Sequence, residues 1–111
     1  ELDSEELEPA GAQVRRAFAN RARLAGMRRD ELPRARLARA MPLRWERDLG
    51  RGRGLLLVDA GTNARLTASD ASIRVVERLD GATTLARLGA DRAALALCRE
   101  LLELGALRFA A

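Results

Sequence analysis

Few side chains in this sequence could support catalysis. It contains no histidine, tyrosine or lysine, and its one cysteine, Cys98, lies among leucines and alanines. Histidine-based triads, histidine-ligated metal sites and lysine Schiff bases are therefore excluded. A thiol inside an apolar helix, with no neighbouring base, should have a raised pKa and stay unreactive. We expect Cys98 to be structural, and we expect neither a metal nor a cofactor.

Two carboxylate pairs have spacings that could serve acid–base chemistry, Glu100 with Glu103 and Asp70 with Glu77. Both pairs fall on the polar faces of predicted helices, so they are interpreted as solvated surface residues and not as an acid–base pair. The glycines at 50, 52 and 54 lack the lysine of a phosphate-binding loop and the spacing of a dinucleotide fingerprint. They are interpreted as hairpin glycines. We predict that the chain is not an enzyme.

Length and composition indicate one small domain. The chain has 111 residues, of which 48% are hydrophobic and only 3% aromatic, so leucine, valine and alanine must build the core. That balance favours helices over a sheet sandwich. All 20 basic residues are arginines, but 16 carboxylates interleave with them, so charge alone is weak evidence for nucleic-acid binding. No apolar run reaches the ~18 residues of a membrane span, no secretory signal is visible, and the lone cysteine fits a reducing compartment. A cytoplasmic location is expected.

The region from 42 onward predicts an α+β, winged-helix-like fold. Strands are expected at 43–47, 54–59 and 62–66, joined by short connections as an antiparallel meander. Three helices then follow. Thr67 and Asp70 form a capping pattern for a helix over 68–79, a short helix is expected at 84–88, and Asp91 caps a final helix that ends at Gly105. The closing residues can place their apolar side chains, Leu107 and Phe109, on the core.

The first 41 residues predict an extra helical segment. An acidic lead-in at 1–8 precedes a helix over 10–25 with Val14 and Phe18 on its apolar face. Asp30 can cap a second helix that carries Leu37 and Met41 on one face and ends before Pro42. Residues 10–41 hold nine arginines against two acidic residues. Three interpretations are open: a solvated helical pair packed on the domain, a polyanion-binding patch, or an arm that belongs to a neighbouring module.

The final helix has more apolar surface than one packing partner needs. At 100° per residue its apolar side chains span an arc of about 200°, wider than the stripe of an ordinary surface helix. One part of this arc can face the helix at 68–79, while Leu97, Leu101 and Leu104 need separate cover. The amino-terminal helices, a partner segment in a groove, or the seam of a homodimer could supply it. We favour the groove.

The strand at 62–66 would complete such a groove. It is the last strand of the meander, so one side of its backbone should be unpaired and could accept an extended peptide as an added strand. Leu66 should point inward, with Asn63 and Arg65 bordering the groove and Arg65 able to pair with an acidic peptide residue. The candidate peptide-binding residues are Thr62, Asn63, Ala64, Arg65, Leu66, Leu97, Leu101 and Leu104.

The arrangement resembles the PqqD-like peptide chaperones, the recognition elements for ribosomally synthesised and modified peptides. The matching stretches run through residues 42–109 and are short and apolar. They are Arg44-Trp45, Gly54-Leu55-Leu56-Leu57, Arg65-Leu66, Val75-Val76, Asp80-Gly81, Thr83-Thr84-Leu85 and Leu101-Leu102-Glu103-Leu104-Gly105-Ala106-Leu107.

The resemblance implies a division into an amino-terminal helical arm (1–41) and a peptide-binding domain (42–111). It also implies that the domain binds a leader peptide between its third strand and last helix and presents the precursor to a modifying enzyme such as a radical-SAM protein. The alternative is a winged-helix DNA-binding regulator. That class displays polar and arginine side chains on its recognition helix, whereas the last helix here shows leucines, so nucleic acid is the weaker expectation. We expect no membrane partner.

Overall fold

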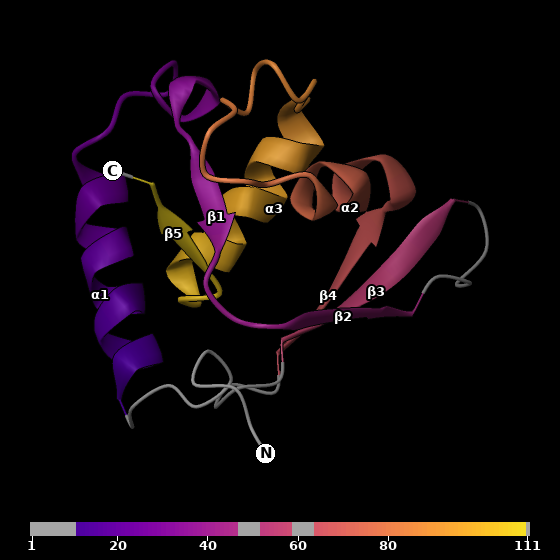
Figure 1. Cartoon of the computed structure of the whole chain (residues 1–111), viewed down its shortest axis with the longest axis horizontal. Helices are drawn as coiled ribbons and strands as arrows, with labels where there is room; N and C mark the ends of the chain where they lie inside the picture. The colour runs from indigo at the N-terminus through magenta and orange to yellow at the C-terminus, as the bar shows by residue number, and fades with distance from the viewer. Residues whose placement is uncertain (1–10, 47–51, 59–63, 111) are drawn as a thin grey trace.

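The computed structural model describes residues 11–46, 52–58 and 64–110. Within them the chain is an α+β fold with three α-helices and two small antiparallel sheets. In Figure 1, α1 lies at one side of the molecule and the three-stranded sheet at the other, with α3 and β5 between them. The elements are α1 (Ala12–Ala25), the 3-10 helix η2 (Leu32–Arg34), β1 (Leu37–Arg39), β2 (Leu43–Glu46), β3 (Arg53–Val58), β4 (Ala64–Ser69), α2 (Asp70–Glu77), α3 (Arg92–Glu103) and β5 (Leu107–Phe109).

The predicted antiparallel meander is confirmed as the sheet β2-β3-β4. Its residues alternate between two faces, as a strand period of two requires. Leu56 and Val58 of β3 are fully buried, and Leu55 and Leu57 on the opposite face are half-buried. Leu56 pairs with Leu66 across β3 and β4. One face of the meander therefore closes the core.

The first helix after the meander starts later than the capping pattern suggested. Thr67 is not the cap, because β4 continues through it and pairs it with Leu55. Ser69 is the N-cap instead, and its hydroxyl oxygen accepts a hydrogen bond of 3.2 Å from the Ser72 amide. The expected inward face is confirmed, with Ile73, Val75, Val76 and Leu79 all buried.

The short helix expected at 84–88 is wrong, because this segment consists of turns and one bridge between Arg36 and Thr84. In place of a helical hydrogen bond, the Leu85 amide donates to the carbonyl of Ala35, outside this segment, at 3.1 Å.

The turn just before this segment is held by Asp80. Its carboxylate accepts hydrogen bonds from the Ala82 and Thr83 amides, both 2.9 Å long. These bonds stabilise the charged form and lower the pKa of Asp80. The Asp91 cap is confirmed, with a 2.9 Å hydrogen bond from the Ala94 amide.

The prediction of a second amino-terminal helix, capped by Asp30 and ending before Pro42, is also wrong. In its place η2 leads into β1, which pairs antiparallel with β5 at the far end of the chain. Leu37 lies opposite Phe109 in this pair, and the Ala40 amide extends it by donating to the Ala106 carbonyl at 2.9 Å. Leu37 is completely buried. The closing tail does place Leu107 in the core, as expected, and it does so as a strand.

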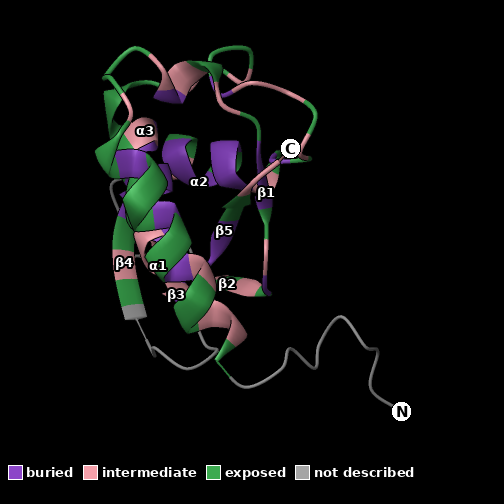
Figure 2. Cartoon of the chain, turned by 90° about the vertical axis from the view of Figure 1, so that its left-hand side faces the viewer, coloured by how far each residue is buried: buried purple, intermediate pink, exposed green. Residues whose placement is uncertain are grey.

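The predicted helix α1 is present, but the face expected to be its apolar contact face is exposed. Val14 is 72% and Phe18 73% exposed, whereas Ala17, Asn20 and Leu24 are buried against the molecule. Figure 2 shows α1 in front of the core, with its exposed side toward the viewer. Leu24 and three residues between α1 and the meander belong to the same core cluster as β3, α2 and α3; the three are Leu32, Leu37 and Met41. Both parts of the described chain thus share one core.

Candidate functional site

β4 is an edge strand. It pairs with β3 on one side, and no strand of the described residues pairs with its other side. The Asp70 amide donates to the carbonyl of Gly52, the residue opposite it, at 2.7 Å. Because hydrogen-bonded pairs alternate along an antiparallel ladder, the backbone groups of Leu66 face β3 and those of Arg65 and Thr67 face away. The amides and carbonyls of Arg65 and Thr67 are therefore directed to the outer side of β4.

The side chains of β4 alternate in the same way. Arg65 and Thr67 are exposed, whereas Leu66 packs against the core cluster, as expected for an inward residue. The Thr67 hydroxyl contacts an Arg53 guanidinium nitrogen at 3.5 Å. Ala64 pairs through its backbone with Val58. Two predicted site residues, Thr62 and Asn63, lie outside the described residues.

The predicted outer face of α3 is largely inside the molecule. Leu97 is 5% exposed and Leu101 is completely buried, and only Leu104 is half-buried. The expectation that these three leucines form an open groove face is wrong for Leu97 and Leu101, because α3 packs against α1, α2, β4 and β5. These neighbours occupy its wide apolar arc. Cover from within the chain, the interpretation we did not favour, is what the structure shows.

Polar side chains fix α1 against the end of α3. The last carbonyls of a helix have no partner within the helix. Gln13 donates to the Leu104 carbonyl at 2.9 Å and Arg16 to the Gly105 carbonyl at 2.7 Å. Asn20 lies four residues after Arg16, which places it on the same face of α1 as Gln13 and Arg16. Sequence reasoning missed this face because it took the apolar residues of α1 as the contact.

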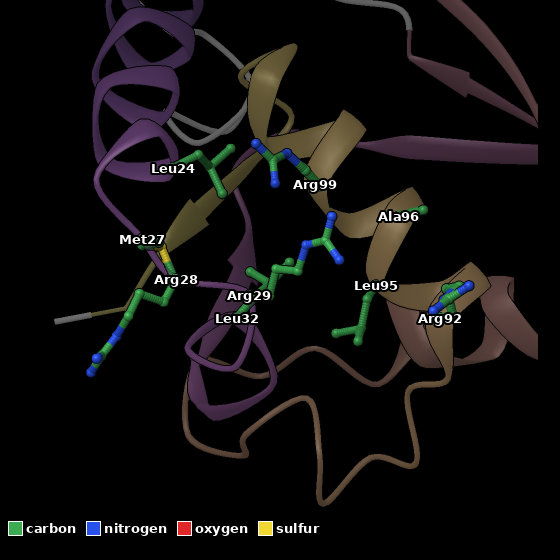
Figure 3. A pocket seen from close by; sticks show the side chains of 9 residues that line it. All are labelled: Leu24, Met27, Arg28, Arg29, Leu32, Arg92, Leu95, Ala96 and Arg99. Atoms are coloured by element: carbon green, nitrogen blue, oxygen red, sulfur yellow. The ribbon is translucent and has the colours of Figure 1, made fainter.

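A cavity of about 260 Å³ lies between the end of α1, the turn before η2 and the part of α3 from Arg92 to Arg99. Its apolar lining includes Leu24, Leu32 and Leu95. Arginines from the same segments surround this lining, as Figure 3 shows. The excess of arginine in residues 10–41 was apparent from the sequence, but the position of Arg28 and Arg29 beside arginines of α3 was not.

Cys98 is buried and has no disulfide partner. Burial disfavours the thiolate and raises the pKa of Cys98 to about 12. The predicted inert, structural character of this thiol is supported by that environment. Within residues 11–46, 52–58 and 64–110, no three acidic, cysteine or histidine side chains are grouped as metal ligands would be. No helix in the same residues has the length and apolar character needed to cross a membrane.

Comparisons of the chain with protein-family models, curated proteins and solved structures gave no match.

Proposed function

We propose that this chain binds the leader segment of a ribosomally synthesised precursor peptide as a strand added to β4, and presents it to a modifying enzyme such as a radical-SAM protein. The observation that carries the proposal is the edge position of β4: no strand of the described residues pairs with its outer side, to which the backbone groups of Arg65 and Thr67 are directed. An extended peptide can pair with such groups through its own main chain.

Two further features support this proposal. The resemblance to PqqD-like peptide chaperones was drawn from a meander followed by three helices. The structure has the meander, α2 and α3, whereas the segment expected as the short middle helix consists of turns, and α3 packs beside β4. Arg65 is exposed at the same edge and offers a guanidinium to an acidic peptide side chain. Leu97 and Leu101 were expected to contact the peptide, but they are buried and cannot do so directly. We propose instead that these side chains hold α3 in place beside β4.

The decisive experiment compares two proline substitutions by calorimetric titration with the leader peptides encoded beside the gene. Arg65→Pro removes an outward amide and should weaken peptide binding about tenfold or more, with a small change in melting temperature. Ala64→Pro removes an amide directed at β3 and should mainly lower the melting temperature. Arg65→Ala separates side chain from backbone and should retain most of the affinity.

Equal binding by Arg65→Pro and the parent protein would refute strand addition at β4. Titration with duplex DNA tests the alternative function. A winged-helix regulator would bind DNA with an affinity that falls steeply with salt, because phosphate contacts release counterions. A tight, sequence-specific DNA complex would replace the peptide proposal.

A further inference from the structure

The cavity beside α3 combines an apolar floor with a rim of arginine side chains. Leu24 and Leu32 at its floor belong to the core and are 4% and 9% exposed. Among the residues that the structure describes, its lining contains no aspartate or glutamate. The charged side chains among these lining residues are all arginines, namely Arg28, Arg29, Arg92 and Arg99.

Two of these arginines converge. Figure 3 shows the side chains of Arg29 and Arg99 reaching into the space between the end of α1 and α3, while Arg28 is directed away from it. Arg28 also pairs with Glu31 at 3.3 Å. In the part of the chain that the structure describes, no ion pair engages Arg29 or Arg99. Two guanidinium groups that share one hollow repel each other, and a bound anion would relieve this repulsion.

The position of α3 adds to the positive potential. Arg92 is the first residue of this 12-residue helix, so one end of the cavity lies at its first turn, where the helix dipole favours negative charge. Asp91 offsets part of this field, but its carboxylate is engaged as the helix cap by the Ala94 amide at 2.9 Å. A guanidinium binds a carboxylate through two parallel hydrogen bonds, which gives the site a preferred ligand group.

We propose that this cavity binds an acidic peptide segment, with a carboxylate side chain held by Arg29 and Arg99 and a neighbouring apolar side chain on the floor formed by Leu24, Leu32 and Leu95. A volume of about 260 Å³ is below the range of about 300–1,000 Å³ usual for pockets that enclose a whole small molecule, and it suits one or two side chains. The site is separate from strand addition, because no lining residue belongs to β4.

The test uses the full chain and a capped, fluorescent peptide of alternating glutamate and leucine. The parent protein should bind it, and the same peptide with glutamine in place of glutamate should bind about tenfold more weakly or worse. The variant carrying Arg29→Gln and Arg99→Gln should lose at least about tenfold in affinity. Both residues are exposed, so the variant should fold, which thermal melting checks. Arg74→Gln, an exposed arginine on α2, is the matched control and should bind like the parent.

Three outcomes would overturn the proposal. One is unchanged affinity in the double variant, and another is an equal loss in Arg74→Gln, which would indicate a non-specific charge effect. The third is full competition by inorganic phosphate at low concentration, which would indicate a site for a free anion. Arg65→Pro in β4 should bind this probe like the parent, so failure at the cavity and failure of strand addition can be told apart.

Discussion

The side-chain amide of Asn20 in α1 donates a hydrogen bond of 2.9 Å to the backbone carbonyl of Leu102 in α3. The same nitrogen donates a second bond, also 2.9 Å, to the carbonyl of Leu107 in β5. Asn20 is only 6% exposed, so its two amide hydrogens join three elements away from water. The packing of α1 on the molecule therefore depends on a polar residue at its centre.

We predict that Asn20→Ala destabilises the protein by about 2 kcal/mol, because the Leu107 carbonyl loses its side-chain donor and the Leu102 carbonyl keeps only the Gly105 amide at 3.0 Å. Phe18→Ala is the matched control on the same helix. It removes a much larger apolar side chain, but that side chain is 73% exposed, so the change should stay within about 0.5 kcal/mol. Urea unfolding of both variants gives the comparison. A larger effect of Phe18→Ala would mean that α1 packs through its other face.

Gly105 should not tolerate alanine, since α1 passes directly over it. Its φ is +78°, and an added Cβ would lie 2.5 Å from the Gln13 carbonyl oxygen. Gly89 has the same φ of +78° with no atom within 4 Å of such a Cβ. Gly89→Ala should therefore cost only the backbone strain, about 1–2 kcal/mol.

Gly105→Ala introduces the same backbone strain and must also displace α1. It should therefore lower the free energy of unfolding by at least about 2 kcal/mol more than Gly89→Ala in the same urea unfolding assay. The pair isolates the close approach of α1, because both glycines share one conformation. Equal costs in the two variants would argue that α1 does not rest on Gly105.

The parts of this fold that could be predicted are set by local chemistry. Asp91 and Gly105 mark the ends of α3, and the strands of the meander follow each other with short connections. The pairing of β1 with β5 could not be predicted in this way, because Leu37 and Phe109 are far apart in sequence and the intervening chain brings them together. Residues 36–41 also carry an apolar spacing that suits a helix, and long-range pairing overrode it.

For the candidate site, the position of the strand could be predicted from the sequence, but the accessibility of the leucines of α3 could not. The edge position of β4 follows from strand order alone, and no strand of the described residues pairs with its outer side. The accessibility of Leu101 was not foreseeable, because the width of an apolar arc shows how much cover a helix needs but not where the cover comes from. Here α1 packs against α3, and Gln13, Arg16 and Asn20 bind backbone carbonyls at the end of that helix, so the polar character of these residues concealed the contact.

The burial of Cys98 can be tested by measuring how protein stability depends on alkaline pH. The sequence has no histidine, tyrosine or lysine, so no other side chain titrates between about pH 9 and 11. Burial raises the pKa of Cys98 from 9.0 to about 12 in the folded protein. The folded state therefore holds this proton more tightly than the unfolded state. The contribution to stability is complete below pH 9.0 and declines as pH rises toward 12.

We predict that the free energy of unfolding falls by roughly 1.4 kcal/mol per pH unit above about pH 9, the slope for one proton. Cys98→Ala should be somewhat less stable at pH 8 because it leaves a small cavity, but its stability should be nearly constant from pH 9 to 11. Denaturant unfolding of both proteins at several pH values, with the thiol kept reduced, measures the two slopes. Parallel slopes in the parent and the variant would show that the Cys98 thiolate is solvated in the folded state, and that the centre of α3 is open to water.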